Sequence, residues 1–296
     1  MNKNISILGM PLHAGQPKKG THLGPNALRE AGLIKTLSDL GYNVTDCGDI
    51  ELGEEQKSES GAKLKNLDYI KNVCEELADG VTKIIVNKEF PFLLGGDHSM
   101  AIGTIAGLAK RYKNLGVIWF DAHGDLNTED TSPSGNIHGM PLAISLGLGE
   151  KSLVEIGGLS PKVKIENVVL IGCRDLDAGE VKLINEKGIK LFDMDDIKKL
   201  GIEVITKQAL AHLNGCDGIH LSYDVDAISP DVIPGTGTTV EGGLSYVESV
   251  KMLEVLKDSN KITSLELVEV NPLLEVNESD KGLTAKNAVG IIKNLF

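Results

Sequence analysis

The chain has few aromatic residues and no excess of positive charge, and both shortages narrow the classes of protein it can belong to. Aromatic residues make up 4% of its 296 positions, so the core must be built mainly from Leu, Ile and Val, which suit buried parallel strands. The formal net charge is −12 at pH 7. A nucleic-acid binder needs a basic stripe that neutralises phosphates, so this balance argues against a nucleic-acid partner and is compatible with a small cationic one.

Cysteine is also scarce, and long apolar runs are missing. The four cysteines are far apart and show no CxxC spacing, which argues against a zinc finger or a disulfide framework: Cys47, Cys74, Cys173 and Cys216. We expect buried free thiols in a cytoplasmic protein. The N-terminal apolar stretch is too short for a signal-peptide core, and no run approaches the ~20 residues that a membrane helix needs, so we expect no membrane partner.

Short apolar runs alternate with amphipathic segments along the whole chain, which predicts an α/β fold. We expect a single domain over residues 1–296, with three α/β/α layers and a mostly parallel central sheet of about eight strands. The predicted strands are 4–9, 43–47, 90–94, 115–120, 167–172, 189–192, 218–223 and 261–268. The predicted helices are 25–39, 61–87, 99–112, 138–147, 178–187, 202–213, 245–258 and 280–294; Ser245 and Glu248 have the spacing of a capping box.

Clusters of metal-competent side chains follow several of these apolar runs. Asp121, His123 and Asp125 alternate with small residues, and in an extended chain side chains at i, i+2 and i+4 point to one side. Asp224 and Asp226 repeat the pattern after another apolar run. Because ligands of parallel α/β sheets bind beyond the carboxyl ends of the strands, we expect these side chains to meet.

Together with His98, these residues offer two imidazoles and four carboxylates to a candidate metal site: His98, Asp121, His123, Asp125, Asp224 and Asp226. Four carboxylates balance the charge of two divalent ions. A mixed carboxylate and imidazole set without thiolate suits Mn²⁺, with Fe, Co and Zn as alternatives. Any one of these residues alone is more simply read as a turn residue, a helix cap or a satisfied polar side chain.

Five motifs in this order resemble the ureohydrolases, the arginase–agmatinase family of binuclear manganese enzymes: GGDHS at 95–99, DAHGD at 121–125, SPSGNIHG at 132–139, SYDVD at 222–226 and EVNP at 269–272. The loop formed by residues 125–128 and 131–141 is similar to that of the arginases within this family. The resemblance implies two Mn²⁺ ions per subunit, a homotrimer or homohexamer, and hydrolysis of L-arginine to L-ornithine and urea through a metal-bridging hydroxide.

The resemblance also implies roles for individual residues. The six residues of the candidate metal site would hold the two ions, and Asp125 would in addition take the proton of the hydroxide. Glu269 would pair with the guanidinium, and His138 would relay protons near the leaving amine. Residues that would bind arginine are Asn127, Ser132, Ser134 and Asn136 at the α-carboxylate, Asp177 and Glu180 at the α-ammonium, and Thr238 near the guanidinium.

Some alternatives stay open. Asp177 and Glu180 are equally read as acids that complement the dipole of a helix in its first turn. Ala227 and Ser229 stand where the family has a Gly-Leu-Asp-Pro type of sequence, and Thr239 stands where a proline is usual; the loss of a carboxylate at Ser229 bears on metal affinity. Other functions to weigh are another ureohydrolase, such as an agmatinase or a guanidinobutyrase, and a non-catalytic metal-binding regulator.

Overall fold

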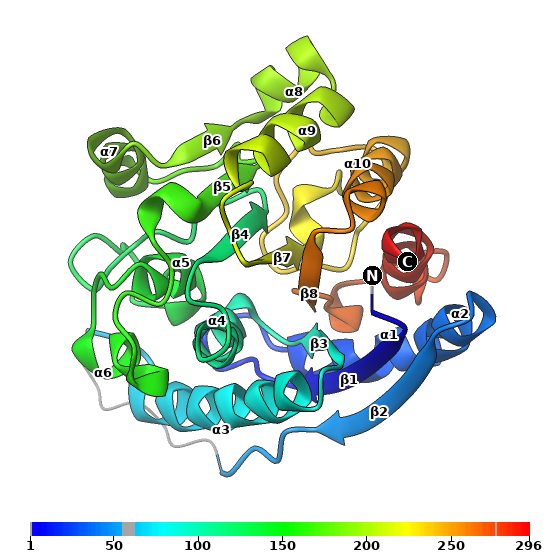
Figure 1. The fold of residues 1–296 in the computed structure, drawn as a ribbon, viewed down its shortest axis with the longest axis horizontal. Helices are drawn as coiled ribbons and strands as arrows, with labels where there is room; N and C mark the ends of the chain where they lie inside the picture. The colour runs from blue at the N-terminus through cyan, green and yellow to red at the C-terminus, as the bar shows by residue number, and fades with distance from the viewer. Residues whose placement is uncertain (1, 55–62, 276) are drawn as a thin grey trace.

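A computed structural model describes residues 2–54, 63–275 and 277–296. Over these residues eight strands form one sheet in the order β2-β1-β3-β8-β7-β4-β5-β6, and every neighbouring pair is parallel (Figure 1). The strands are β1 (Asn4–Met10), β2 (Asn43–Asp49), β3 (Phe90–Gly95), β4 (Leu115–Phe120), β5 (Val168–Ile171), β6 (Lys190–Phe192), β7 (Gly218–Asp224) and β8 (Ile262–Val268). The predicted α/β class is confirmed, with each strand where the sequence predicts it to within two residues.

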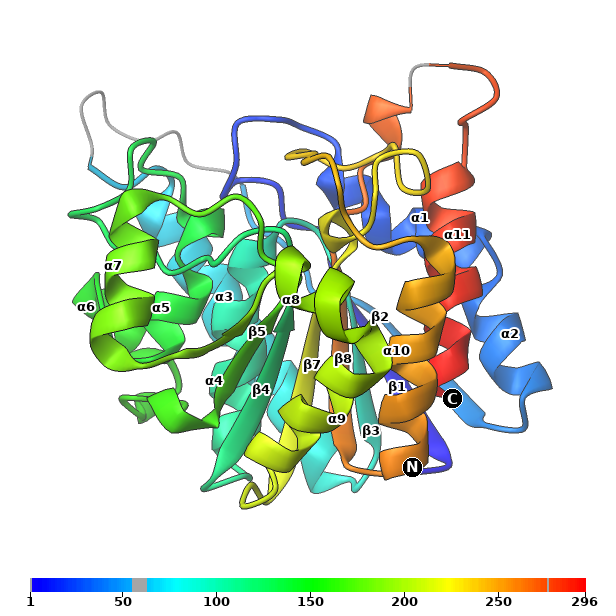
Figure 2. The ribbon, with the colours of Figure 1, turned by 90° about the horizontal axis from the view of Figure 1, so that it is seen from above.

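Helices cover both faces of the sheet, as Figure 2 shows. Those on one face are α1 (Gly24–Glu30), α2 (Leu33–Asp39), α8 (Met194–Leu200), α9 (Ile202–His212), α10 (Tyr246–Ser259) and α11 (Leu283–Ile292). Those on the other face are α3 (Leu67–Val86), α4 (Ala101–Ala109), α5 (Pro141–Ser145), α6 (Lys151–Val154) and α7 (Ala178–Lys187). The three α/β/α layers are therefore as expected.

Each layer boundary has its own aliphatic core, because successive side chains of a strand point to opposite faces. In β4, Ile118 and Phe120 pack with α8 to α11, whereas Val117 and Trp119 pack with α3 and α4. All four are buried. β4 is buried on both faces and has no polar side, which explains why it reads as an apolar run.

The helices agree less closely with the sequence. The predicted helix 25–39 is two helices, because Gly32 takes a left-handed conformation (φ 88°) between them. The expected helix 61–87 begins at Leu67, and residues 61 and 62 of that prediction lie outside the described part of the chain. The short helices α6 and α8 were not predicted. The capping box of Ser245 and Glu248 is confirmed at the start of α10.

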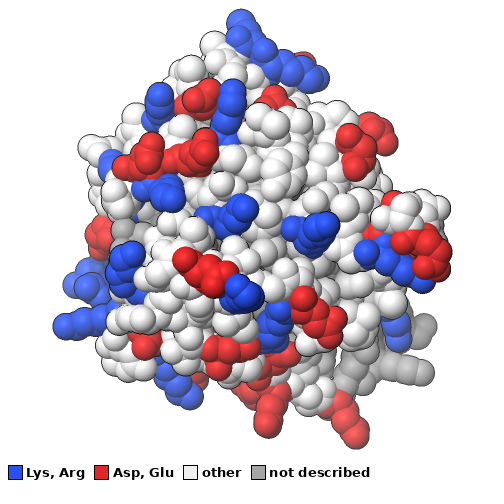
Figure 3. Space-filling model, turned by 90° about the vertical axis from the view of Figure 1, so that its right-hand side faces the viewer, with Lys and Arg blue, Asp and Glu red and all other residues white. Residues whose placement is uncertain are grey.

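The exposure of the cysteines differs from the expectation that all four are buried. Cys74 and Cys173 are buried, but Cys216 is only partly buried and Cys47 is exposed, because β2 is an edge strand with little covering it. On the face in Figure 3, basic and acidic side chains are intermixed.

Among the helices that the structure describes, none is both long and apolar enough to cross a bilayer.

The order of the sheet brings the carboxyl ends of β3, β8, β7 and β4 side by side. Long loops gather at this edge, uppermost in Figure 2. Most of the predicted site residues follow these four strands, although the strands are far apart in the sequence, whereas Asp177 and Glu180 follow the neighbouring β5. The sheet order thus explains why distant motifs meet at one place.

Candidate metal centre

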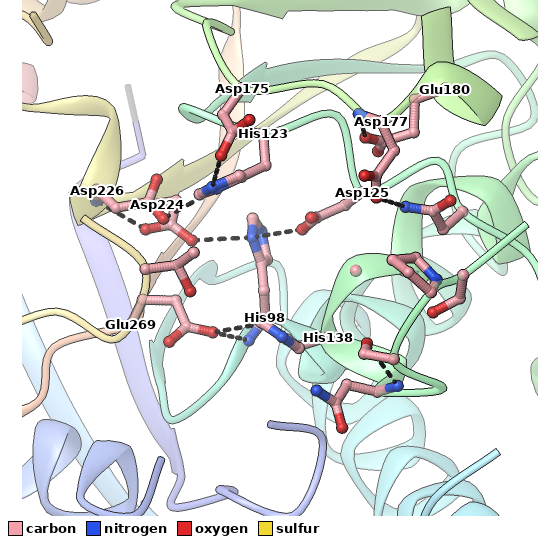
Figure 4. A pocket seen from close by; sticks show the side chains of 17 residues that line it. His98, His123, Asp125, His138, Asp175, Asp177, Glu180, Asp224, Asp226 and Glu269 are labelled. Atoms are coloured by element: carbon pink, nitrogen blue, oxygen red, sulfur yellow. Dashed lines mark hydrogen bonds and ion pairs between the residues drawn. The ribbon is translucent and has the colours of Figure 1, made fainter. Parts of the chain in front are cut away.

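A cavity of about 210 Å³ opens at the carboxyl ends of these four strands (Figure 4). All the site residues predicted from the sequence line it except Asp121, which is buried and contacts two of the lining residues, His98 and His123. Asp175, which the sequence did not single out, also lines the cavity and lies 4.0 Å from Nε2 of His123.

His98 lies at the centre of one half of the cluster. Its Nδ1 atom is 3.0 Å from Oδ2 of Asp121, 3.0 Å from Oδ2 of Asp125 and 3.1 Å from Oδ2 of Asp224. All four side chains are buried. One ring nitrogen carries at most one proton, so it cannot satisfy three carboxylate oxygens by hydrogen bonding. Oxygen and nitrogen atoms converging in this way suit a shared cation.

His123 contacts the carboxylates of the other half of the cluster. Its Nδ1 atom is 3.1 Å from Oδ2 of Asp226 and 3.3 Å from Oδ1 of Asp121. Asp121 therefore belongs to both halves, with one carboxylate oxygen directed at each imidazole. The His123 side chain is 20% exposed and that of His98 only 1%, so this half is the more open to solvent.

The backbone of residues 121–125 differs from the extended chain that we assumed. Strand β4 ends at Phe120, and residues 121–123 form a bend. Asp125 then takes a left-handed conformation with φ 50°, and Glu269, after β8, does the same with φ 67°. The three side chains still meet because the chain curves around the cluster, so strand alternation is not the reason.

The single tryptophan supports the cluster, a role that the sequence analysis missed. The Trp119 ring stacks on the His98 ring with centroids 4.2 Å apart and planes 6° from parallel. Its Nε1 donates a hydrogen bond to Oδ2 of Asp121 at 3.1 Å. Trp119 therefore limits the orientations of one imidazole and one carboxylate at once.

Four buried carboxylates outnumber the two imidazoles of the cluster, so their negative charge is only partly compensated. Burial raises the pKa of Asp224 well above its usual range, and Asp226 and Asp121 raise it further. Burial and Asp121 likewise raise the pKa of Asp226 to about 6. Burial alone would raise the pKa of Asp121, but hydrogen bonds from His123 and His98 lower it overall. Divalent cations among these carboxylates would stabilise their ionised forms, so the donor set fits such ions.

Glu269 and His138 lie across the cavity from this cluster. Glu269 is buried, and its Oε1 accepts a hydrogen bond from the His98 backbone N–H at 2.8 Å and lies 3.8 Å from Nδ1 of His138. Burial lowers the pKa of His138, but the neighbouring Glu269 carboxylate raises it overall. Gln16, which we did not predict, donates from Nε2 to Oε2 of Glu269 at 2.6 Å. These residues are 253 apart in the sequence, and no local pattern connects them.

The outer part of the cavity is formed by the loop 127–136 and the start of α7. Asn127 donates from Nδ2 to Oδ2 of Asp177 at 2.8 Å, and Lys65 donates from Nζ to Oδ1 of Asn136 at 2.9 Å. The Ser132 and Ser134 hydroxyls accept backbone N–H groups within the same loop. Thr238 lines the cavity from the loop after β7.

Glu180 is more enclosed than the other residues of this outer part. Its two carboxylate oxygens accept hydrogen bonds from the backbone N–H groups of Leu126 (2.9 Å) and Asp177 (2.8 Å), and Asp177 and Glu180 form a capping box at the start of α7. Burial raises the pKa of Glu180 to about 7. A helix-capping role for Glu180 is thus plain in the structure, beside its position in the cavity wall.

Comparisons with known proteins agree with this architecture. The model of the Arginase family matches residues 3–296. The chain is 53% identical to the arginase of Bacillus subtilis (strain 168) over 296 residues, which is 100% of this chain and 98% of the relative. The solved arginase of Bacillus caldovelox is 49% identical with a TM-score of 0.95, covering 100% of this chain and 98% of the other. That of Entamoeba histolytica, in complex with L-ornithine, is 34% identical with a TM-score of 0.92, covering 99% and 98%.

The fold, the imidazole–carboxylate cluster and these matches define a hydrolase of the ureohydrolase class. Within that class, the chain belongs to the arginase family.

Proposed function

We propose that the chain hydrolyses the guanidinium group of L-arginine to L-ornithine and urea, with two Mn²⁺ ions bound in each subunit. The observation that carries the proposal is the buried cluster of two imidazoles and four carboxylates in a cavity that also contains Glu269. The relatives support the substrate, because they are arginases and one was solved with L-ornithine, the product expected here.

The six residues of the metal centre would hold the ions in two sets that share Asp121. His98 and Asp125 belong to one set, to which we add Asp224 because its Oδ2 lies 3.1 Å from Nδ1 of His98, and His123 and Asp226 complete the other. Mn²⁺ suits this set because the ligands are carboxylates and imidazoles without a thiolate. When bound, such ions lower the pKa of a coordinated water and so supply a nucleophile at neutral pH.

The side chains around the guanidinium would position the substrate and transfer protons. A guanidinium is a poor electrophile, so its carbon must be held in place and its leaving nitrogen must be protonated. Glu269 is buried and accepts hydrogen bonds from Gln16 and the His98 backbone, so it is positioned to pair with the cationic group. Asp125 would accept the proton of the attacking water. His138, 22% exposed, would pass a proton to the departing amine.

The outer part of the cavity would recognise the amino-acid end of arginine. Asn127, Ser132, Ser134 and Asn136 offer neutral hydrogen-bonding groups for the α-carboxylate, and Asp177 and Glu180 offer carboxylates for the α-ammonium. We further propose that residues 1–296 act as one domain, and that the protein is a cytoplasmic homotrimer or homohexamer. Native mass spectrometry of the purified protein measures the subunit number.

A substrate panel with metal analysis of the same sample tests the proposed function. Purified protein supplied with Mn²⁺ should release urea from L-arginine far faster than from agmatine or 4-guanidinobutyrate. Good turnover of agmatine without turnover of arginine would mean that the chain is an agmatinase. Tight metal binding without turnover of any of the three would mean a non-catalytic protein.

The variant Asp125→Asn tests the proton acceptor. The amide keeps the size of the side chain but is not a base, so we expect kcat to fall by about 10²- to 10⁴-fold while at least one metal ion per subunit is retained. A kcat close to that of the wild type would contradict this role for Asp125.

A further inference from the structure

A carboxylate and an imidazole lie in the middle of the sheet, where the proposed reaction does not use them. Glu266 of β8 and His220 of β7 are both fully buried. Their chain neighbours Leu221 and Leu265 belong to the apolar core on the opposite face. Burying a carboxylate is unfavourable unless its charge is compensated, so this pair needs an explanation beyond packing.

The pair belongs to a chain of polar contacts that ends at the metal centre. The register of β7 and β8 places Ser222 beside Glu266 and His220 beside Ser264. The Ser222 hydroxyl lies 2.7 Å from Oε1 of Glu266 and 2.8 Å from Nε2 of His98. On the far side, Nε2 of His220 lies 3.2 Å from the same Oε1 atom, and its Nδ1 lies 3.0 Å from the Ser264 hydroxyl.

The chemistry of these groups determines which one donates and which one accepts in each hydrogen bond of this series. An ionised carboxylate only accepts hydrogen bonds, and a serine hydroxyl has one proton to donate. Ser222 therefore donates to Glu266 and can only accept from His98, so Nε2 of His98 carries a proton. In the neutral ring the lone pair is then on Nδ1, where it would be available to an ion held among the carboxylates of Asp121, Asp125 and Asp224.

His220 completes the argument because it favours the ionised form of Glu266. Burial would raise the pKa of Glu266, but His220 outweighs this and lowers it overall. A neutral carboxylic acid could donate to Ser222 and reverse the direction of the chain. With His220 beside it, the carboxylate remains an acceptor.

We propose that Glu266, paired with His220, is a positioning residue that fixes the orientation and protonation of the His98 ring for metal binding through Ser222. This inference rests on the proposed metal centre. A hydrogen-bonded partner behind a ligating histidine commonly contributes 10- to 100-fold to metal affinity, or about that factor in activity. The affinity of the protein for its ion is therefore the quantity to measure.

The experiment compares Mn²⁺ dissociation constants, by chelator competition, for the wild type, Ser222→Ala, Ser222→Thr and Glu266→Gln. We expect Ser222→Ala and Glu266→Gln to bind about 10- to 100-fold more weakly. Ser222→Thr keeps the hydroxyl and should recover most of the affinity. In Glu266→Gln the amide can donate as well as accept, so the direction of the chain is lost.

Ser249→Ala is the matched control. Ser249 is also a fully buried serine, but its hydroxyl donates to the Ser245 carbonyl at the start of α10. The thermal stability of each metal-free protein is measured alongside. A purely structural role for the polar chain would lower this stability in Ser222→Ala and Ser249→Ala alike, without a selective loss of Mn²⁺ affinity.

The outcomes separate this inference from the proposed function. If the wild type binds no Mn²⁺, the metal centre itself is wrong. If the wild type binds Mn²⁺ and Glu266→Gln binds it equally tightly, the positioning role is wrong and the metal centre stands. If Glu266→Gln does not fold, equal affinities of Ser222→Ala and Ser222→Thr overturn the inference, and a loss confined to Ser222→Ala supports it.

Discussion

The inner cluster and the outer wall of the cavity are built in different ways. The inner carboxylates and His98 are buried and lie at the carboxyl ends of β3, β7 and β4, so the strand order of the sheet determines where they lie. The outer wall is held by side-chain contacts between loops, such as Lys65 with Asn136 and Asn127 with Asp177. If the proposed roles are right, chemistry depends on the sheet and selectivity on the loops, and variants in the two regions should affect different kinetic constants.

The largest effect is expected from Asp121→Asn, because Asp121 is the one carboxylate shared by both halves of the inner cluster. We expect the affinity for both metal ions to fall and kcat to fall by roughly 10³-fold or more, since metal-ion catalysis supplies several kcal/mol of transition-state stabilisation. Urea release and metal content after dialysis measure this. Retention of two ions with normal turnover would show that Asp121 is not shared in solution.

An intermediate effect is expected in the outer wall from Asn127→Ala. Loss of one hydrogen bond to a charged group corresponds to about 1.5–3 kcal/mol, so KM for arginine should rise by about 10- to 100-fold. The low activity on agmatine, which has no α-carboxylate, should not change.

Thr128→Ala, in the same loop but outside the cavity lining, is the control for Asn127→Ala. Equal losses on arginine and agmatine, or no loss on arginine, would mean that Asn127 does not recognise the α-carboxylate.

The smallest effect is expected at Glu180, where the two regions meet. Burial raises the pKa of Glu180 to about 7, whereas the unfolded chain releases this proton near pH 4.5. Between these pH values the folded state holds more protons than the unfolded state, so stability falls as pH rises through the window. Glu180→Gln should remove a pH-dependent contribution on the order of 1 kcal/mol.

Denaturant unfolding of the metal-free protein between pH 4.5 and 7.5 measures this contribution. Glutamine has one acceptor oxygen where Glu180 uses two, so the variant keeps only one of the two backbone hydrogen bonds and loses some stability at every pH. The readout is therefore the pH dependence of stability and not its absolute value. The same pH dependence in the wild type and in Glu180→Gln would show that Glu180 ionises normally in the folded protein.

Most of the strands were predictable because they are short apolar runs, and this signal is local; the edge strand β2 is the exception, since it is mostly polar and exposed. The break at Gly32 was not predictable, because glycine is tolerated within a helix. Only its left-handed conformation, which the fold sets, separates α1 from α2. The exposed Cys47 was missed for a similar reason, since the position of β2 at the sheet edge is a property of topology.

The same limit applies to the candidate site. The motifs around Asp121 and Asp224 stand out because several ligand types gather within a few residues. Gln16 and Trp119 have no such pattern, and their contacts with Glu269 and His98 exist only after folding. The polar residues of the β7–β8 pair are visible in the sequence, because His220 and Ser222 alternate with apolar residues in a strand that is buried throughout.

The left-handed backbone at Asp125 and Glu269 has a consequence for selection. Non-glycine residues in this region carry a conformational penalty of about 1–3 kcal/mol that the surrounding structure must offset. Glycine at either position would relieve the strain while removing a carboxylate that the proposed reaction needs. In a mutant library selected for thermal stability alone, we therefore expect glycine to replace Asp125 and Glu269 early and to give inactive proteins. Such a selection must also require catalytic activity.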